Sequence, residues 1–162
     1  MSEGFTDTTK YGVVLAVLKD GQIYMSQRTD SVTYPKKWNV ISGMQRPDEQ
    51  SIDTAYRLLT EQMLIHAEKK RFHFVESINT VTNELFYVYL LSLNPLEVPC
   101  NTKKEYRNEW RLFPIKKSMI LDVVPGIRNI VRNLFRAEFY SKTAETDKEL
   151  RTHLGPKMTR LV

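Results

Sequence analysis

Apolar residues near the start of the chain follow the pattern of two paired strands. Residues 11–18 form an almost continuous apolar run, which predicts a buried strand. Asp20 and Gly21 come directly after it, and this pair is a strong indication of a tight hairpin turn. Residues 22–28 then predict the returning strand, and the polar stretch 29–37 predicts a loop.

Residues 38–50 predict a short strand followed by a polar turn. Gly43 has no Cβ atom, so the backbone at the turn is free of the clashes that a side chain would make. Pro47 and Asp48 are typical turn residues.

A helix is predicted from residue 52 onward because apolar residues recur there at helical spacing. The expected buried stripe consists of Ile52, Ala55, Tyr56, Leu59 and Met63. Asp48 or Ser51 is the expected N-cap, since short polar side chains bind the free amides of the first turn. Leu58, Glu61 and Gln62 are three and four positions apart, so they are expected together on another face of this helix.

The second half of the chain predicts three more strands and another helix. The strands are expected at residues 71–78, 84–93 and 109–113, with a long loop at 94–108. Pro125 is expected to start the helix, because proline is tolerated in a first turn. The apolar stripe of that helix consists of Ile127, Ile130, Val131, Leu134 and Phe135. This order of elements predicts an α+β domain with a mixed sheet between helices.

With 162 residues, the chain is long enough for one domain with a sizeable core. We expect a flexible N-terminal arm at residues 1–9, the folded domain at 10–140 and a polar C-terminal tail at 141–162. The sequence has neither an apolar run of membrane-spanning length nor a secretory signal pattern. Cys100 is the single cysteine, which excludes an internal disulfide and fits the reducing cytoplasm. We therefore predict a cytoplasmic protein without a membrane span.

Positive charge exceeds negative charge, with a formal net charge of +5. Small basic groups occur at Lys36-Lys37, Lys69-Lys70-Arg71, Lys103-Lys104 and Lys116-Lys117. Two interpretations stay open: these are solvated loop charges, or they attract an anionic partner such as a nucleotide or RNA.

The stretch 43–65 resembles the Nudix box, G-x5-E-x7-R-E-U-x-E-E-x-G-U, in which U is a bulky aliphatic residue. The matching positions are Gly43, Glu49, Arg57, Leu59, Glu61 and Ile65. Leu58 and Gln62 stand where two helix glutamates are expected, and Leu64 stands where a glycine is expected. Residues 28–43 are similar to the approach to the box in the isopentenyl-diphosphate-isomerase-like branch. The resemblance covers roughly residues 11–135 and implies a Nudix-like α/β/α sandwich with a mixed β-sheet between helices.

Nudix hydrolases cleave a nucleoside diphosphate linked to another group, and they use Mg²⁺ or Mn²⁺. The resemblance implies Glu49, Glu61 and Arg57 as catalytic residues, and Gly43, Glu49, Glu61 and Glu109 as metal ligands. Glu105 is the alternative to Glu109, which is preferred because Trp110 follows it. Arg28, Lys37 and Arg46 are the candidate substrate-binding cations.

Two main functions remain open on this sequence, beside a third option of an interaction or regulatory domain that uses the tail at 141–162. The first is a divergent Nudix-type pyrophosphohydrolase, and the second is a catalytically impaired Nudix-fold module that binds a nucleotide or RNA without hydrolysis. Leu58 cannot bind a cation, and Gln62 offers only a neutral carbonyl oxygen, so weak metal binding is expected. Each lost charge is worth about 4 kcal/mol at 4 Å and an effective dielectric constant near 20. A homodimer is the candidate assembly, because dimers are common among Nudix relatives.

Overall fold

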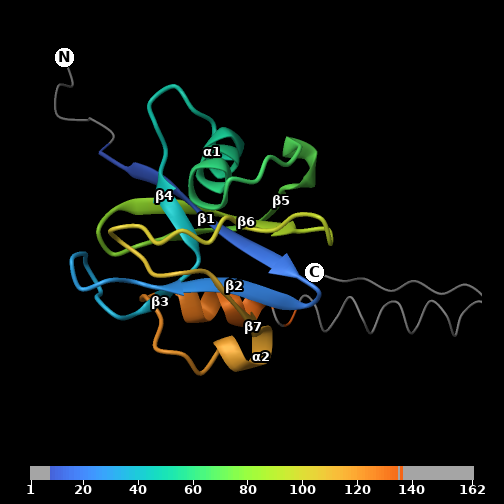
Figure 1. Ribbon diagram of the computed structural model, residues 1–162. Helices are drawn as coiled ribbons and strands as arrows, with labels where there is room; N and C mark the ends of the chain where they lie inside the picture. The colour runs from blue at the N-terminus through green and yellow to red at the C-terminus, as the bar shows by residue number, and fades with distance from the viewer. Residues whose placement is uncertain (1–7, 135, 137–162) are drawn as a thin grey trace, which may run out of the picture.

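The structure is a computed structural model that describes residues 8–134 and 136. A mixed sheet lies between α1 on one face and, on the other, α2 and a helix at residues 127–134 (Figure 1). The strands are β1 Lys10–Lys19, β2 Gln22–Gln27, β3 Trp38–Asn39, β4 Ile41–Met44, β5 His73–Asn79, β6 Glu84–Ser92 and β7 Arg111–Pro114. The named helices are α1 Ser51–Met63, the 3-10 helix η1 Lys69–Arg71 and α2 Ile115–Ser118. The predicted α+β class is therefore confirmed, whereas the predicted tail at 141–162 lies outside the described residues.

Strand β1 organises the sheet, because it pairs with three other strands. It runs parallel to β6 along its whole length, from the Lys10–Glu84 pair to the Leu18–Ser92 pair. On its other edge, the first half of β1 pairs antiparallel with β4, and its end pairs antiparallel with β2. Strand β2 also pairs with β3 and β7, so β2 and β4 separate as they leave β1. The candidate site lies between β2 and β4, where the two strands have separated.

The turn between β1 and β2 has the geometry that its two residues predict. Asp20 has a φ of 50° and Gly21 a φ of 74°. Positive φ at both central residues is the requirement of the tight hairpin turn that matches the twist of paired strands. The predicted hairpin is therefore confirmed.

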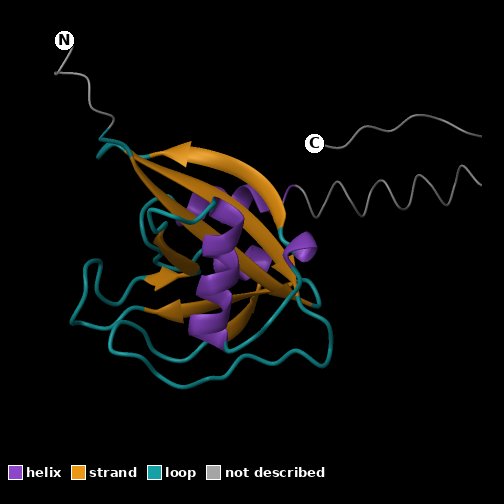
Figure 2. Cartoon of the chain, turned by 90° about the horizontal axis from the view of Figure 1, so that it is seen from above, coloured by secondary structure: helices purple, strands orange, loops and turns teal. Residues whose placement is uncertain are grey.

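Side chains of β1 alternate between two hydrophobic cores. Val13 and Leu15 pack with Leu59 of α1, while Val14 and Ala16 pack with Ile130 and its neighbours. Figure 2 shows α1 lying across one face of the sheet. Both predicted stripes are largely confirmed, and the buried members are Ala55, Leu59, Met63, Ile127, Ile130, Val131 and Leu134. Ile52 and Tyr56 are half-buried against the first core, and the side chain of Phe135 is not described.

The two helices start at different residues from those predicted. Gln50, rather than Asp48 or Ser51, is the N-cap of α1, and its backbone N–H donates to Asp53 Oδ2 at 3.0 Å. Helical structure in the second helix begins at residue 127, because Pro125 and Gly126 form a turn in which Gly126 has a φ of 91°. Within the described chain, we find no helix of the length and apolarity needed to cross a membrane.

Candidate functional site

Arg57 of α1 connects the helix to the polar turn that precedes it. Its guanidinium donates to both oxygens of Glu49, with Nε–Oε2 at 2.7 Å and Nη2–Oε1 at 2.9 Å. Nη2 also donates to the carbonyl oxygen of Met44, and Nη1 donates to Glu61 Oε1, each at 2.9 Å. One arginine therefore holds β4, the turn and two acidic side chains together.

Glu49 is an ionised carboxylate that accepts four hydrogen bonds, three of them at Oε1. Besides Arg57, it accepts hydrogen bonds from the Arg46 amide and from Thr54 Oγ1, each at 2.9 Å. Hydrogen bonds from Arg57 are the main cause that lowers the pKa of Glu49 from its ordinary value of 4.5 to about 2. An efficient general base has a pKa near the working pH. The geometry therefore favours a structural role for Glu49 over a role as proton acceptor.

Leu58 takes the place of the first helix glutamate, and its side chain lies inside the protein. It is 5% exposed and belongs to the core formed by α1 and the sheet, which corrects its predicted place outside the buried stripe, on one face with Glu61 and Gln62. Gly43 lies in β4 opposite Val13, so it is a strand residue and not the predicted turn residue. A Cβ atom at Gly43 would lie 2.6 Å from Leu58 Cδ2. The missing side chain at 43 thus makes room for Leu58.

We predict that Gly43→Ala lowers the free energy of unfolding by about 1–3 kcal/mol, because Leu58 must move away from the new methyl group. Leu58→Ala alone is also destabilising, since it leaves a cavity. The double variant should lose at least about 1 kcal/mol less than the sum of the two losses. Chemical denaturation of the four proteins measures this coupling, and strict additivity would contradict the contact.

The implied metal ligands do not form an acidic cluster. Glu61 is half-exposed, and its carboxylate lies 2.9 Å from Arg57 Nη1 and 3.8 Å from Arg46 Nη2. Glu109 lies on the approach to β7, with its carboxylate 3.9 Å from Lys103. No three His, Cys, Asp or Glu side chains gather at a potential metal site within residues 8–134 and 136. The donors present therefore do not fit the Mg²⁺ or Mn²⁺ site that the resemblance implied.

The three candidate substrate-binding cations have separate partners. Arg28 donates through Nε to the Thr33 carbonyl oxygen at 2.6 Å, and Lys37 pairs with Asp122 at 2.6 Å. Arg46 lines a different cavity, beside the N-terminal end of β1. The structure therefore does not bring the three side chains into one pocket. Of the three, Arg28 lines the pocket at the end of α1.

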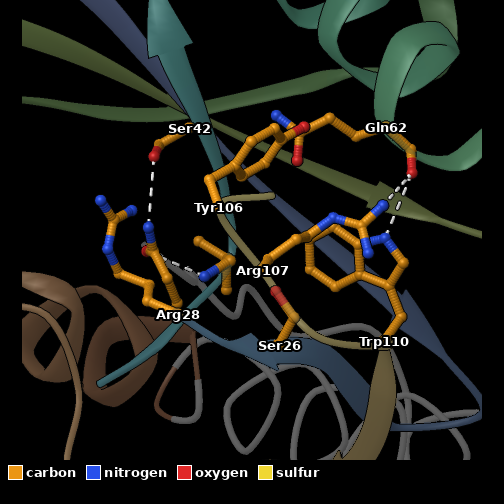
Figure 3. A pocket seen from close by; sticks show the side chains of 9 residues that line it. Ser26, Arg28, Ser42, Gln62, Tyr106, Arg107 and Trp110 are labelled. Atoms are coloured by element: carbon orange, nitrogen blue, oxygen red, sulfur yellow. Dashed lines mark hydrogen bonds between the residues drawn. The ribbon is translucent and has the colours of Figure 1, made fainter. Parts of the chain in front are cut away.

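A small pocket lies between β2, β4, the end of α1 and the loop before β7 (Figure 3). Its volume is about 40 Å³, and its lining consists of Ser26, Arg28, Asn39, Val40, Ser42, Gln62, Tyr106, Arg107 and Trp110. Gln62 stands in the box position of the last helix glutamate. The pocket thus lies at the end of α1 beside one box position, and its lining includes none of the four implied metal ligands.

Arg107 is the buried charged residue of this small pocket, with 2% of its surface exposed. Nη2 donates to the backbone carbonyl oxygen of Gln62 at 2.8 Å, and Nη1 donates to the backbone carbonyl oxygen of Asn108 at 3.0 Å. Nε has no hydrogen-bond partner. The guanidinium also lies 4.5 Å from the ring centre of Trp110. Burial lowers the pKa of Arg107, but an arginine stays cationic in proteins. The prediction of site residues missed Arg107, since a basic residue in a polar loop is usually solvated.

A larger cavity adjoins the small pocket, since Asn39 and Ser42 line both. Its volume is about 440 Å³, and it lies on the face of the sheet opposite α1, beside Val14, Phe86 and Ile130. Pockets for small molecules and cofactors commonly have about 300–1,000 Å³ and a mainly apolar lining. The cavity has the size and lining of such a pocket.

Comparison with known proteins identifies the fold. No protein-family model and no curated protein matches the chain. The NUDIX domain of Shewanella oneidensis NrtR, solved in complex with ADP ribose, aligns with a TM-score of 0.65 at 12% identity, over 83% of this chain and 90% of that one. A mutT/nudix family protein from Listeria innocua aligns at 0.64 and 16% identity, over 90% of this chain and 99% of that one. A MutT/nudix family protein from Enterococcus faecalis aligns at 0.58 and 12% identity over 67% of this chain, which spans 45% of that longer protein.

Proposed function

We propose that this chain, which has the Nudix fold, is a module that binds a nucleotide-type ligand without metal-dependent hydrolysis. The observation that carries the proposal is the burial of Leu58 against Gly43, at the position of the first box glutamate. An apolar side chain within the core supplies no oxygen to a hard cation. Of the two functions that the sequence left open, this geometry favours the binding module.

The class of ligand is supported by the cavity and by one structural neighbour. The cavity of about 440 Å³ has the size of a small-molecule site. The NUDIX domain of Shewanella oneidensis NrtR was solved with ADP ribose, a nucleotide-type molecule. The net charge of +5 also favours an anionic ligand.

A divergent hydrolase remains the second candidate because of Glu61. Its side chain is 48% exposed and carries a carboxylate at a box position, so it is accessible to a cation from solvent. A hydrolase of this type would depend on Glu61 with little help from Glu49, whose oxygens are held by Arg57.

We predict that isothermal titration calorimetry detects ADP-ribose or a related nucleotide binding with a Kd that changes less than about twofold between magnesium and EDTA. A panel of ADP-ribose, NADH, nucleotide sugars, dinucleoside polyphosphates and capped RNA should show no turnover with magnesium or manganese. Turnover that Glu61→Gln abolishes would establish the hydrolase instead. An absence of binding across the whole panel would contradict both candidates.

A further inference from the structure

We infer that the small pocket at the end of α1 is a metal-independent anion subsite, in which Arg107 binds a phosphate-type group. The inference deepens the proposed function, on which it rests for the assignment of that anion to a nucleotide-type ligand. The large adjoining cavity would hold the rest of the ligand, since Asn39 and Ser42 line both spaces.

The first argument is the charge of Arg107, which is buried without a counterion. Arg107 is 2% exposed. In the part of the chain that the structure describes, no carboxylate lies within ion-pair distance of its guanidinium. The guanidinium donates to the backbone carbonyl oxygens of Gln62 and Asn108, which are neutral, and it also interacts with the side chain of Tyr106. A buried charge without an opposite charge is strongly unfavourable in a protein interior. A bound anion would offset this cost.

The second argument is the unused hydrogen-bonding capacity at the pocket. Arg107 Nε is buried and has no partner, although a guanidinium in a fixed fork geometry suits phosphate oxygens. Arg28 lines the same pocket and directs its Nε and Nη2 to Thr33. Arg28 also lines an open cavity next to the loop after β2, so it connects the pocket with solvent. Arg28 therefore lies at the entrance of the small pocket and Arg107 at its buried end, and both side chains are positively charged.

The third argument is the size of the pocket. A volume of about 40 Å³ exceeds the roughly 10–15 Å³ that a single water molecule needs. The space suits one small polyatomic anion, and the hydroxyl-bearing residues Ser26, Ser42 and Tyr106 in its lining can donate further hydrogen bonds. Figure 3 shows Ser26 and Tyr106 beside the side chain of Arg107, and Ser42 farther away, on the other side of Tyr106.

The neutral side chain at Gln62 also fits this inference. Gln62 lines the pocket, and its backbone carbonyl oxygen accepts from both Arg107 and Trp110 Nε1, at 2.8 and 3.2 Å, so these two bonds do not depend on the side chain at 62. A glutamate at this position would bring a negative charge into the pocket and compete with an external anion. Loss of the box glutamate and burial of Arg107 are then two parts of one change, which places a fixed cation at the end of the helix.

Inorganic phosphate in EDTA is the probe that tests the inference, with calorimetry and thermal unfolding as readouts. Phosphate should bind the wild-type chain and raise its Tm. Arg28→Gln should weaken phosphate binding about tenfold, which equals 1.4 kcal/mol. The matched control Arg111→Gln removes the same charge from an exposed position on β7 and should leave the affinity within about twofold.

Gln62→Glu separates an anion site from a merely structural arginine. We expect this variant to have a higher Tm than the wild type without phosphate, because the glutamate supplies the missing counterion, and to lose at least about tenfold in phosphate affinity. Arg107→Gln should abolish phosphate binding, and Gln62→Glu keeps the test decisive if that variant does not fold.

The inference is overturned if phosphate does not bind, or if Gln62→Glu and Arg28→Gln bind it as tightly as Arg111→Gln does. If ADP-ribose binds the wild type and these two variants equally well, the inference fails while the proposed function stands. If phosphate binding depends on Gln62 and Arg28 but no nucleotide binds, the proposed function fails and the anion subsite stands.

Discussion

The Leu58→Glu variant is expected to lose about 4 kcal/mol of the free energy of unfolding at pH 7. Leu58 is 5% exposed and packs in the core between α1 and the sheet, with Gly43 directly beside it. A glutamate there must either bury a carboxylate without a partner or leave the core, and both choices remove apolar contacts. Denaturant unfolding followed by circular dichroism measures the loss.

Leu58→Met is the matched control for this variant, because it conserves volume and apolarity and should cost less than about 1.5 kcal/mol. Addition of magnesium provides a second comparison. If Leu58→Glu stays within about 1 kcal/mol of the wild type, or if magnesium restores its stability, the position is a latent metal ligand. Either result would contradict the placement of position 58 in the core.

Local patterns in the sequence were sufficient to predict most of the fold. Residues 12–17 of the predicted run are buried because β1 lies between two cores, and Asp20 with Gly21 forms the turn that their residue types favour. The predicted position of the Leu58 side chain was wrong, although the spacing of apolar residues in the sequence indicates that it is buried. Ala55, Leu58 and Leu59 have the i, i+3, i+4 spacing of one apolar face, but the prediction grouped position 58 with Glu61 and Gln62, which lie three and four positions after it.

The candidate site could be predicted only in part, since much of it depends on contacts between residues distant in sequence. The ion pairs of Arg57 involve residues 4 and 8 positions away, within reach of a spacing argument. The contact of Arg107 with Gln62 spans 45 positions and is made to a backbone oxygen, for which no side-chain pattern exists. Glu109 was preferred because of Trp110, yet the indole of Trp110 donates to Gln62 while Glu109 lies beside Lys103.

Arg57→Ala is the second variant with a large expected effect, a loss of about 3 kcal/mol at pH 7. The side chains of Arg57 and Glu49 are 18% and 14% exposed, so removal of the arginine leaves a mostly buried carboxylate without its cation. The ion pair between Arg57 and the half-exposed Glu61 contributes little to the expected loss of stability. Urea unfolding of the wild type and the variant at pH 7 measures the difference.

The loss caused by Arg57→Ala should shrink in acid. The folded-state pKa of Glu49 is about 2, below its ordinary value of 4.5, so the ion pair stabilises the protein above pH 4.5 and loses this effect as the pH falls toward 2. Without Arg57, burial raises the pKa of Glu49, and the variant gives up less stability over that interval. Arg46→Ala is the matched control, because this arginine is 60% exposed at 3.8 Å from Glu61 and should cost less than about 0.5 kcal/mol. A loss for Arg57→Ala that is the same at pH 7 and pH 2.5 would show that Arg57 acts through its contacts with the backbone of Met44 and through packing, and that the charge of Glu49 contributes nothing.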